Sequence, residues 1–460
     1  MDAPTGRPAA FDSESDFPPS STAFYTLFLL FMAYVFSFVD RSVLSLLVGP
    51  IREEFGLSDF EFSLLHGAAF ASLYCVVSIP LGVLADRVSR RRIVAVSVLF
   101  WSLMTCLCGL ARTAPQLVVA RMGVGAGEAG LTPPAYSIIL DSFPPRSVGF
   151  AMAFYKLGVM VGGGLALIVG GALFDYFVEL GGIELPILGR LAPWQATFLS
   201  IGAPGFILAG LLISIHEPTR KGVARSEDQT ELTALPMKTV VRFLWERRRT
   251  YGSLFLGSSL LAVAGFGTTA WYPEFLVRSY GLSKADAGAA YGTIYLVGGM
   301  LGVFAGPLLV RVLERRGYAD ANVRAILITS LATVIPGTLA PLAGSLTMTL
   351  ALAAPATFLG STYLGVMALS FQQITPNQMR GQTTAVYILV TSIAGMAFGT
   401  SILAAFTDFV FGDDGALNLS LATLSAIFYP MASLLFWFCL PAYRESVREA
   451  GNWDLGRTAK

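Results

Sequence analysis

Long apolar runs, separated by short clusters of charged and turn-forming residues, dominate this chain of 460 residues. Each run approaches or exceeds the roughly 20 residues that an α-helix needs to cross a bilayer. The pattern predicts twelve spans, over 23–49, 60–85, 92–112, 116–140, 148–174, 194–215, 250–275, 284–310, 323–344, 346–374, 382–407 and 417–441. We therefore expect an all-α polytopic membrane protein with twelve transmembrane helices.

The polar segments divide these spans into two groups of six. Residues 1–22 are polar and rich in proline and serine, which is typical of a disordered cytoplasmic tail. A six-helix bundle is expected over 23–215 and another over 250–443, joined by a linker at 216–249 and followed by a second cytoplasmic tail at 444–460.

The linker contains a candidate surface helix. Between Pro236 and Arg249 the spacing of Met237, Val240, Val241 and Leu244 is helical and amphipathic, which predicts a helix on the inner membrane face.

An internal repeat supports the division into halves. Gly56-Leu57-Ser58 recurs as Gly281-Leu282-Ser283, and Arg91-Arg92 recurs as Arg315-Arg316. Two parallel six-helix halves related by an axis along the membrane normal are the organisation of the major facilitator fold. The same offsets place glycines opposite Asp40 and Glu128, so intramembrane charge is expected in the first half alone.

Composition and charge placement agree with a membrane protein. The hydrophobic fraction is 54%, the charged fraction 13% and the mean hydropathy +0.65, whereas soluble domains carry about a quarter charged residues. Twenty-three of the 31 lysines and arginines fall on one side of the predicted topology and five on the other. The positive-inside rule then predicts cytoplasmic termini, in a bacterial inner membrane.

Few side chains suggest other chemistry. The four cysteines lie in apolar segments without metal-ligand spacing, and no nucleophile stands beside a base or a phosphate-binding loop. We expect no enzyme activity, no cofactor, no metal and no nucleic-acid partner, and a protein that acts as a monomer.

The first span carries an adjacent acid and base, Asp40 and Arg41. A charge near the bilayer centre costs about 2.5–3.5 kcal/mol even on insertion scales, so such residues usually mark a functional site. The alternative is a neutralised pair that is retained for packing.

The fourth span carries a second pair, Arg121 and Glu128. The two residues are seven positions apart, so a helix places them on nearly the same face, about 10 Å apart along its axis. Together with Asp40 and Arg41 they predict one polar network. The intervening Gly-x-Gly-x-Gly run follows no predicted strand, so helix packing explains it better than dinucleotide binding.

The loop after the second span carries a specific motif. It reads Gly82-Val83-Leu84-Ala85-Asp86-Arg87-Val88-Ser89-Arg90-Arg91-Arg92. This pattern resembles the signature loop of the major facilitator superfamily. The resemblance implies that Asp86 meets the start of the eleventh helix near Gln382 and holds the inner gate shut, with Gly82 allowing close approach and Arg87, Arg90 and Arg91 pairing with acids.

A narrower match extends through the fourth span. Asp40-Arg41, Arg121-x-x-x-Gly-x-Gly-Glu128 and Asp141-x-Phe-Pro-Pro-x-x-Arg146 together resemble the Spinster family of that superfamily. Asp141 and Arg146 are expected to join the inner-face charge network with Arg90 and Arg91, the alternative being a solvated loop.

Span five adds two features that leave alternatives open. Its glycine run, from Gly158 to Gly171, resembles an antiporter motif, and helix packing explains it equally well. Lys156, about two turns from the inner end, suits either an anionic headgroup or a carboxylate partner.

The expected substrate cavity has unlike walls. Besides the charges, the first half offers Tyr34, Phe38, Tyr136 and Lys156; the second offers Trp271, Tyr291, Tyr295, Tyr363, Phe371, Gln372 and Gln373. One charged wall and one uncharged aromatic wall suit an amphiphile. The Spinster resemblance implies lysolipids or sphingoid phosphates as substrates.

These observations predict a proton-coupled secondary transporter that works by alternating access. Asp40 is the expected proton carrier: when ionised it would pair with Arg41 and Arg121, and when protonated it would free them for Glu128 or an anionic substrate. The competing hypotheses are a multidrug or organic-anion proton antiporter and a membrane lipid sensor that does not transport.

Overall fold

The computed structural model describes residues 17–186, 189–219 and 237–455. The first half contains α1 (Ser20–Ser42), η2 (Val43–Leu46), α2 (Val48–Phe55), α3 (Asp59–Ser63), η3 (Leu64–Ala69), α4 (Phe70–Arg87), α5 (Arg90–Gly109), α6 (Ala114–Glu128), α7 (Thr132–Ser142), α8 (Pro145–Glu179), β1 (Ile183–Leu185), β2 (Gly189–Leu191), α9 (Pro193–Gly202) and α10 (Pro204–Leu212).

The second half begins after the linker. It contains α11 (Met237–Glu246), α12 (Arg248–Tyr280), α13 (Lys284–Thr293), η4 (Ile294–Gly298), α14 (Gly299–Arg315), α15 (Ala321–Leu339), η5 (Ala340–Leu342), α16 (Leu346–Ile374), η6 (Asn377–Met379), α17 (Arg380–Ser392), η7 (Ile393–Gly399), α18 (Thr400–Ala405), η8 (Phe406–Phe411), η9 (Asp414–Ala416) and α19 (Leu417–Leu455). The predicted tail at 1–22 falls mostly outside the described residues, as do linker residues 220–236.

Eleven helical stretches of the described chain are long and apolar enough to cross a membrane. The one expected span that is not among these eleven is the fourth, at 116–140, which is divided into α6 and α7. Ala129–Leu131 separate the two helices, and Pro133 and Pro134 stand in the first turn of α7, where a missing N–H is tolerated. The prediction of an all-α polytopic fold is confirmed, with one span interrupted.

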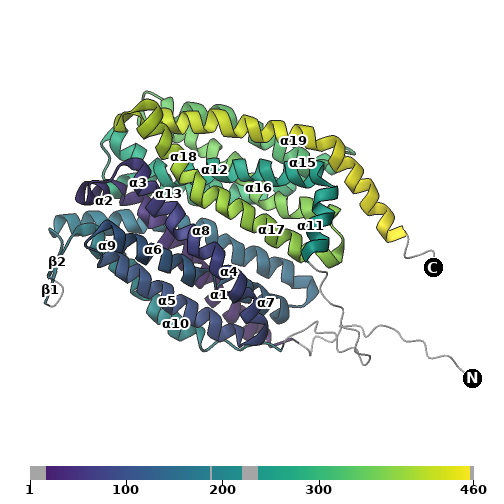
Figure 1. Ribbon diagram of the computed structural model, residues 1–460, viewed down its shortest axis with the longest axis horizontal. Helices are drawn as coiled ribbons and strands as arrows, with labels where there is room; N and C mark the ends of the chain where they lie inside the picture. Colours follow the sequence, from purple (N-terminus) through teal and green to yellow (C-terminus); the bar gives the residue numbers. More distant parts are fainter. Residues whose placement is uncertain (1–16, 187–188, 220–236, 456–460) are drawn as a thin grey trace, which may run out of the picture.

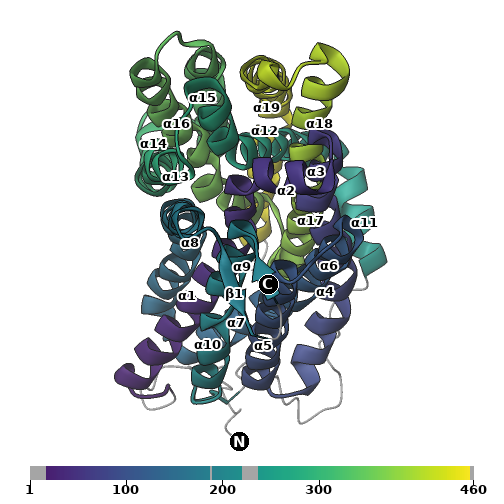
Figure 2. The same ribbon diagram turned by 90° about the vertical axis from the view of Figure 1, so that its left-hand side faces the viewer.

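The two halves form two layers (Figure 1): α1 to α10 lie below α12 to α19 in this view. α11 and the end of α19 lie at one end of the molecule, here called the terminal end. The short hairpin of β1 and β2, with α2 and α3, lies at the opposite end, here called the hairpin end. In the hairpin Ile183 pairs with Leu191 and Leu185 with Gly189. Figure 2 shows the molecule from the hairpin end.

The apolar core connects the halves unequally. One cluster of buried residues runs through the first half and continues into the second through side chains such as Trp271 and Leu403. A second cluster, including Tyr251, Phe371 and Tyr443, belongs to the second half alone. The halves therefore share a core near the hairpin end.

The internal repeat is visible in the local backbone. Gly56 after α2 and Gly281 after α12 both adopt φ of +65°, the left-handed conformation that ends a helix and favours glycine. Ser58 and Ser283 then cap α3 and α13, each accepting a hydrogen bond from a backbone N–H in the first turn.

The glycine run of α8 lets other helices approach closely. A Cβ on Gly162 would lie 2.4 Å from the backbone oxygen of Val35 in α1, and one on Gly163 would lie 2.6 Å from the ring of Tyr295 in η4. These glycines therefore support packing within the first half and between the halves, the second of the two readings of this run.

Candidate functional site

The centre of the site is a buried ion pair between α1 and α6. Nε and Nη2 of Arg41 both lie 2.5 Å from Oε2 of Glu128, and the Ser37 hydroxyl donates to the same oxygen at 2.7 Å. The Glu128 side chain is fully buried and that of Arg41 is 15% exposed. One carboxylate thus receives three donors on a single oxygen.

Asp40 has few partners by comparison. Oδ2 accepts a hydrogen bond from the Thr105 hydroxyl of α5 at 3.0 Å, and Oδ1 has no partner among the described residues. Arg121 donates to the backbone oxygen of Asp40 at 3.2 Å rather than to its carboxyl. The expected pairing of the Asp40 carboxyl with Arg41 and Arg121 is thus not the arrangement in this conformation, because Arg41 is engaged by Glu128.

Aromatic rings surround the Arg41 guanidinium. Its central carbon lies 4.9 Å from the ring centroid of Phe38, 4.6 Å from Phe70 and 5.2 Å from Tyr74. Such cation–π contacts favour a cation that has lost part of its water. The sequence analysis missed Phe70 and Tyr74, although aromatic residues four apart on the second span were a usable signal.

Arg121 lies deeper in the first half and is 1% exposed. Its guanidinium is 5.6 Å from the Phe70 ring, and its Nε has no acceptor among the described residues. Arg121 and Arg41 thus both lie near the Phe70 ring, and the four predicted charges are brought together.

A tyrosine cluster lies beside the charges. Tyr34 stacks on Tyr155 with centroids 4.5 Å apart, and Tyr136 meets Tyr155 edge-on at 5.7 Å. Tyr34 and Tyr136 are partly exposed, whereas Tyr155 is buried. Tyr155 is the residue that the sequence analysis missed, and it positions the two that were predicted.

The second-half residues fall into two groups. Trp271 and Phe371 are 1% exposed and Tyr291 is 2% exposed, so the expectation that they line an open cavity is wrong for this conformation. The Trp271 indole donates to the Thr400 backbone oxygen at 3.1 Å, Tyr291 stacks on Tyr272 and Phe371 packs on Tyr387, so all three serve packing.

The side chains of the other predicted second-half residues are at least partly exposed. Tyr295 and Tyr363 are partly exposed and Gln372 is exposed. The Gln373 amide oxygen accepts from Asn322 and from Tyr443, so this side chain helps to hold its own half together.

Lys156 is exposed on α8, seven positions before Gly163 and on the same face. The described residues offer it no ion pair, so the carboxylate partner considered from the sequence is not found among them. It remains available to an anionic group.

A charge network joins α5, α7 and the end of the first half at the terminal end. Arg90 pairs with Asp141, its backbone N–H donates to Glu217 at 2.8 Å, and the Ser89 hydroxyl donates to Glu217. Burial would raise the pKa of Glu217, but the hydrogen bonds from Ser89 and Arg90 and the Arg90 charge hold it below its usual value. The sequence analysis missed Glu217.

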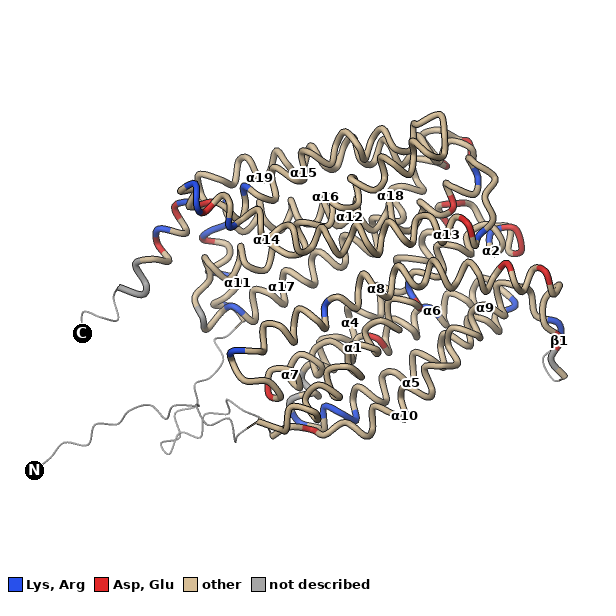
Figure 3. The backbone as a smooth tube through the Cα atoms, turned by 180° about the vertical axis from the view of Figure 1, so that it is seen from behind, with Lys and Arg blue, Asp and Glu red and all other residues tan. Residues whose placement is uncertain are grey.

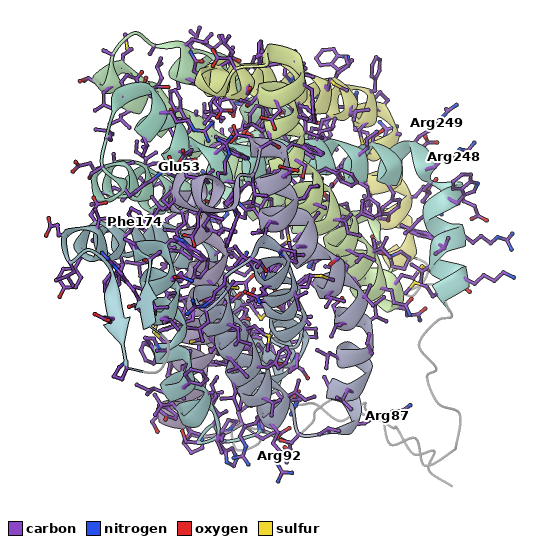
Figure 4. The ribbon with its side chains drawn as sticks, turned by 60° about the vertical axis from the view of Figure 1, so that its left-hand side comes forward. Glu53, Arg87, Arg92, Phe174, Arg248 and Arg249 are labelled. Atoms are coloured by element: carbon purple, nitrogen blue, oxygen red, sulfur yellow. The ribbon has the colours of Figure 1, made fainter. Side chains whose placement is uncertain are left out.

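The predicted members of this network differ in their contacts. Arg91 donates to the Ile215 backbone oxygen at 3.0 Å. Arg87 and Arg146 are exposed, and within the described residues neither has an ion pair, so Arg146 does not join the network. Figure 4 labels Arg87 near this end.

The gate motif is only partly described. A Cβ on Gly82 would meet no atom within 4 Å, so the close approach expected there does not occur in this conformation. The Asp86 side chain, and with it the expected contact near Gln382, lies outside the described residues.

A second ion network joins the two halves at the hairpin end. The buried Asp59 carboxylate lies 2.7 Å from Arg52 of its own half and 2.8 Å from Arg278 of the other. Arg278 also contacts Glu274 at 2.9 Å, and Lys284 contacts Glu274 at 2.6 Å. Figure 3 shows charges gathered at this end.

This hairpin-end network corrects one expectation. Glu274 is 3% exposed and lies within α12, so buried charge is not confined to the first half. Arg52, Arg278 and Lys284 are three of the five cations on the less positive side of the predicted topology. A hydropathy pattern does not show which of such charges fold back between helices.

The same region contains the one carboxylate cluster of the described chain that could suit a cation. Oxygens of Asp59, Asp408 and Asp414 lie within 4.8 Å of one another. However, Asp59 is held by two arginines and Asp408 accepts from the Phe60 backbone N–H at 2.7 Å. The arginines supply the countercharge, so the geometry favours an ion-pair cluster.

Comparisons with known proteins add to this geometry. Residues 30–400 match the model of the Major Facilitator Superfamily. A solved bacterial homolog of the human lysosomal transporter Spinster, in an inward-facing and unoccupied conformation, has a TM-score of 0.75 and 28% identity, covering 94% of this chain and 98% of its own.

Two curated relatives are similar along much of the chain. An MFS-type efflux pump of Mycolicibacterium smegmatis is 24% identical over 417 residues, which are 90% of this chain and 91% of that protein. Protein spinster of Drosophila melanogaster is 26% identical over 313 residues, 65% of this chain and 47% of that protein.

Proposed function

This chain belongs to the major facilitator superfamily and is a secondary transporter that works by alternating access, and from that premise we propose that it couples protons to the movement of an amphiphilic anionic substrate. The Spinster resemblance found in the motifs is confirmed by similarity to the bacterial Spinster homolog.

The main observation behind the proposal is that Arg41 pairs with Glu128 and not with the adjacent Asp40. Arg41 is bonded to Glu128, while the adjacent Asp40 carboxyl is buried with one donor and one unpartnered oxygen. A buried carboxylate with so few donors is costly, whereas a neutral carboxyl is tolerated there. This conformation therefore fits a protonated Asp40.

Loss of that proton would change the pairing. An ionised Asp40 needs a cation, and Arg41 and Arg121 are the nearest ones. Drawing Arg41 from Glu128 alters the contacts between α1 and α6, while Asp40 itself touches α5 through Thr105. A proton can thus bias the packing of three helices, and through them the rocking of the halves.

The unlike walls favour an amphiphile as the substrate. Arg41 is the partly exposed cation at the centre, Lys156 is exposed along α8, and both can attract an anionic headgroup. From the second half, Tyr295 and Tyr363 offer partly exposed aromatic side chains without charge, which suit an acyl chain. We propose a lysolipid or sphingoid phosphate, with the terminal end cytoplasmic in a bacterial inner membrane and one chain forming the complete pathway.

Counterflow in proteoliposomes tests this proposal. Labelled lysophosphatidylglycerol should exchange into vesicles preloaded with the unlabelled lipid, and Lys156→Gln should weaken exchange of this anionic lipid more than exchange of zwitterionic lysophosphatidylcholine. Glu53→Gln, which changes an exposed carboxylate on α2, is the matched control. Absence of exchange for every lysolipid and sphingoid phosphate would reject the substrate class.

The similarity to an efflux pump supports a second candidate, a drug or organic-anion antiporter. The aromatic cluster around Arg41 could also stack on a planar drug. Binding of several unrelated drug cations in preference to lysolipids, measured by thermal shift, would favour this candidate.

A further inference from the structure

α11 lies across the terminal end of the molecule, at a steep angle to the spans (Figure 1). One residue, Arg247, separates it from α12, whose 33 residues Arg248–Tyr280 are long and apolar enough to cross a membrane. α11 therefore stands at the level where a bilayer's headgroups meet its hydrocarbon.

One side of α11 is fixed to the second half. Val240 is fully buried, and the Phe243 ring meets Tyr251 of α12 edge-on at 5.7 Å. Arg247 lies 4.4 Å from the Phe243 ring and pairs with Glu449 of α19 at 3.0 Å. α11 is thus held against the second half by these contacts.

A second side of α11 is apolar and uncovered. Met237, Val241 and Trp245 follow one another at intervals of four, so they form one stripe. Their exposed fractions are 49%, 52% and 70%. The sequence predicts one apolar face, but the structure divides it: Val240 and Leu244 turn toward the protein, and this stripe turns away.

Positive charge borders the exposed stripe. Lys238 follows Met237, the first residue of the stripe, and Arg248 and Arg249 come shortly after Trp245, the last; all three cations are exposed. Figure 4 shows Arg248 and Arg249 projecting outward above α11. Among the described residues neither arginine has an ion pair, whereas Arg242, farther round the helix, is neutralised by Glu246 at 2.9 Å.

We propose that the exposed stripe of α11 and the flanking Lys238, Arg248 and Arg249 form a docking surface for anionic phospholipid of the adjacent leaflet. The apolar stripe would enter the acyl boundary, with Trp245 at the interface where tryptophan is favoured. The cations would hold phosphate headgroups, as arginine does in bidentate contacts. The charge of the surface is what selects an anionic lipid over a zwitterionic one.

The test uses the fluorescence of Trp245 in the full-length protein. Vesicles contain equal parts phosphatidylglycerol and phosphatidylcholine, with bromine quencher on the acyl chains of one lipid or of the other. The difference between the wild type and Trp245→Phe isolates this residue from the other five tryptophans. Because only the label changes places, the quenching ratio reports the local lipid composition at α11.

We expect stronger quenching of Trp245 when phosphatidylglycerol carries the bromine. Arg248→Gln with Arg249→Gln should bring the ratio toward one, since each arginine near an anionic surface changes lipid partition about fivefold. Arg315→Gln with Arg316→Gln, which removes the same exposed charge from the end of α14, should leave the ratio unchanged.

Three results would overturn the proposal. They are equal quenching by the two brominated lipids in the wild type, no quenching by either, and a preference that survives in the Arg248/Arg249 double variant. Should that variant fail to fold, the wild-type comparison of the two labels decides alone.

Discussion

Asp59 shows how much one buried side chain can hold. Its two oxygens accept from Arg278 at 2.8 Å each, and Arg52 approaches at 2.7 Å, so one carboxylate pairs with guanidiniums from both halves. Removing one partner of a buried ion pair destabilises the fold by more than the intact pair contributes to stability, because the remaining charge stays buried without a partner.

Asp59→Asn should therefore loosen the hairpin end. We expect a loss of about 3–5 kcal/mol of unfolding free energy and greater labelling of a cysteine introduced at Gly415. The measurements are thermal unfolding and the rate of maleimide reaction, with Glu53→Gln as the control. Unchanged labelling in Asp59→Asn would contradict the account.

Glu217 gives the terminal end a pH-dependent contribution to stability. Its pKa in the folded protein is lowered despite burial, by hydrogen bonds from Ser89 and Arg90. A depressed pKa means that the contribution is present above the unfolded pKa of about 4.3 and is lost as pH falls through the folded value.

Glu217→Gln should lower the melting temperature at pH 7, by the equivalent of about 1 kcal/mol since the group is partly exposed. Because the wild-type advantage disappears in acid, the two melting curves should converge below pH 4. A difference that persists unchanged at low pH would show that the carboxylate charge is not responsible.

At the residue scale, the sequence showed which charges are unusual but not which ones pair. Asp40, Arg41, Arg121 and Glu128 stand out because charge is costly in an apolar run. The pairing of Arg41 with Glu128 depends on how α1 and α6 are rotated about their axes. The roles of Asp59 and Glu217 depend on contacts between segments that are distant in the sequence. Spacing along one chain contains no such information.

At the scale of elements, irregular helix turns lie where the halves meet. η3, η4 and η7 are π-helical segments within otherwise α-helical spans, and η3 lies against η7 while η4 lies against α8. Each π segment leaves backbone groups without their usual partners and is often found at functional positions. Their place between the halves suits helices that must repack during transport.

Gly67 in η3 is a direct probe of that contact. A Cβ there would lie 2.1 Å from the Met396 backbone oxygen and 2.3 Å from the Thr400 hydroxyl, so Gly67→Ala should push the halves apart near the hairpin end. We expect destabilisation of about 1–3 kcal/mol, the usual range for overpacking.

Gly82→Ala is the matched control, because its Cβ would meet nothing within 4 Å. Thermal unfolding of both variants provides the measurement. Equal melting temperatures for the two would contradict the close contact of η3 with η7.

The spans themselves were predictable, because a membrane helix must be long and apolar. Their irregularities were not. The break between α6 and α7 was signalled by Pro133 and Pro134, yet prolines also occur inside unbroken helices, as Pro273 does in α12. The π segments have no sequence signature that separates them from their α-helical surroundings.

At the scale of the whole molecule, two halves share a core and an ion network at the hairpin end. The hydrogen bonds that the structure describes between them lie on this side, for example from the Ala285 backbone N–H to Asp175 at 2.9 Å. The repeat predicted the halves because their turns use the same residues. It could not predict that Asp59 and Lys284, which occupy equivalent positions, would carry opposite charge into one network.

The central claim is that the charge on Asp40 decides the partner of Arg41 and, through it, the conformation. Distances between spin labels at the terminal end, on cysteines replacing Phe150 of α8 and Arg311 of α14, test it most directly; both sites are exposed. The four native cysteines are first replaced. In the wild type, the distance between the two labels should shorten as pH rises and Asp40 ionises. In Asp40→Asn, the distance should stay at its longer, low-pH value at every pH. An Asp40→Asn protein that follows the wild-type pH dependence would contradict the account.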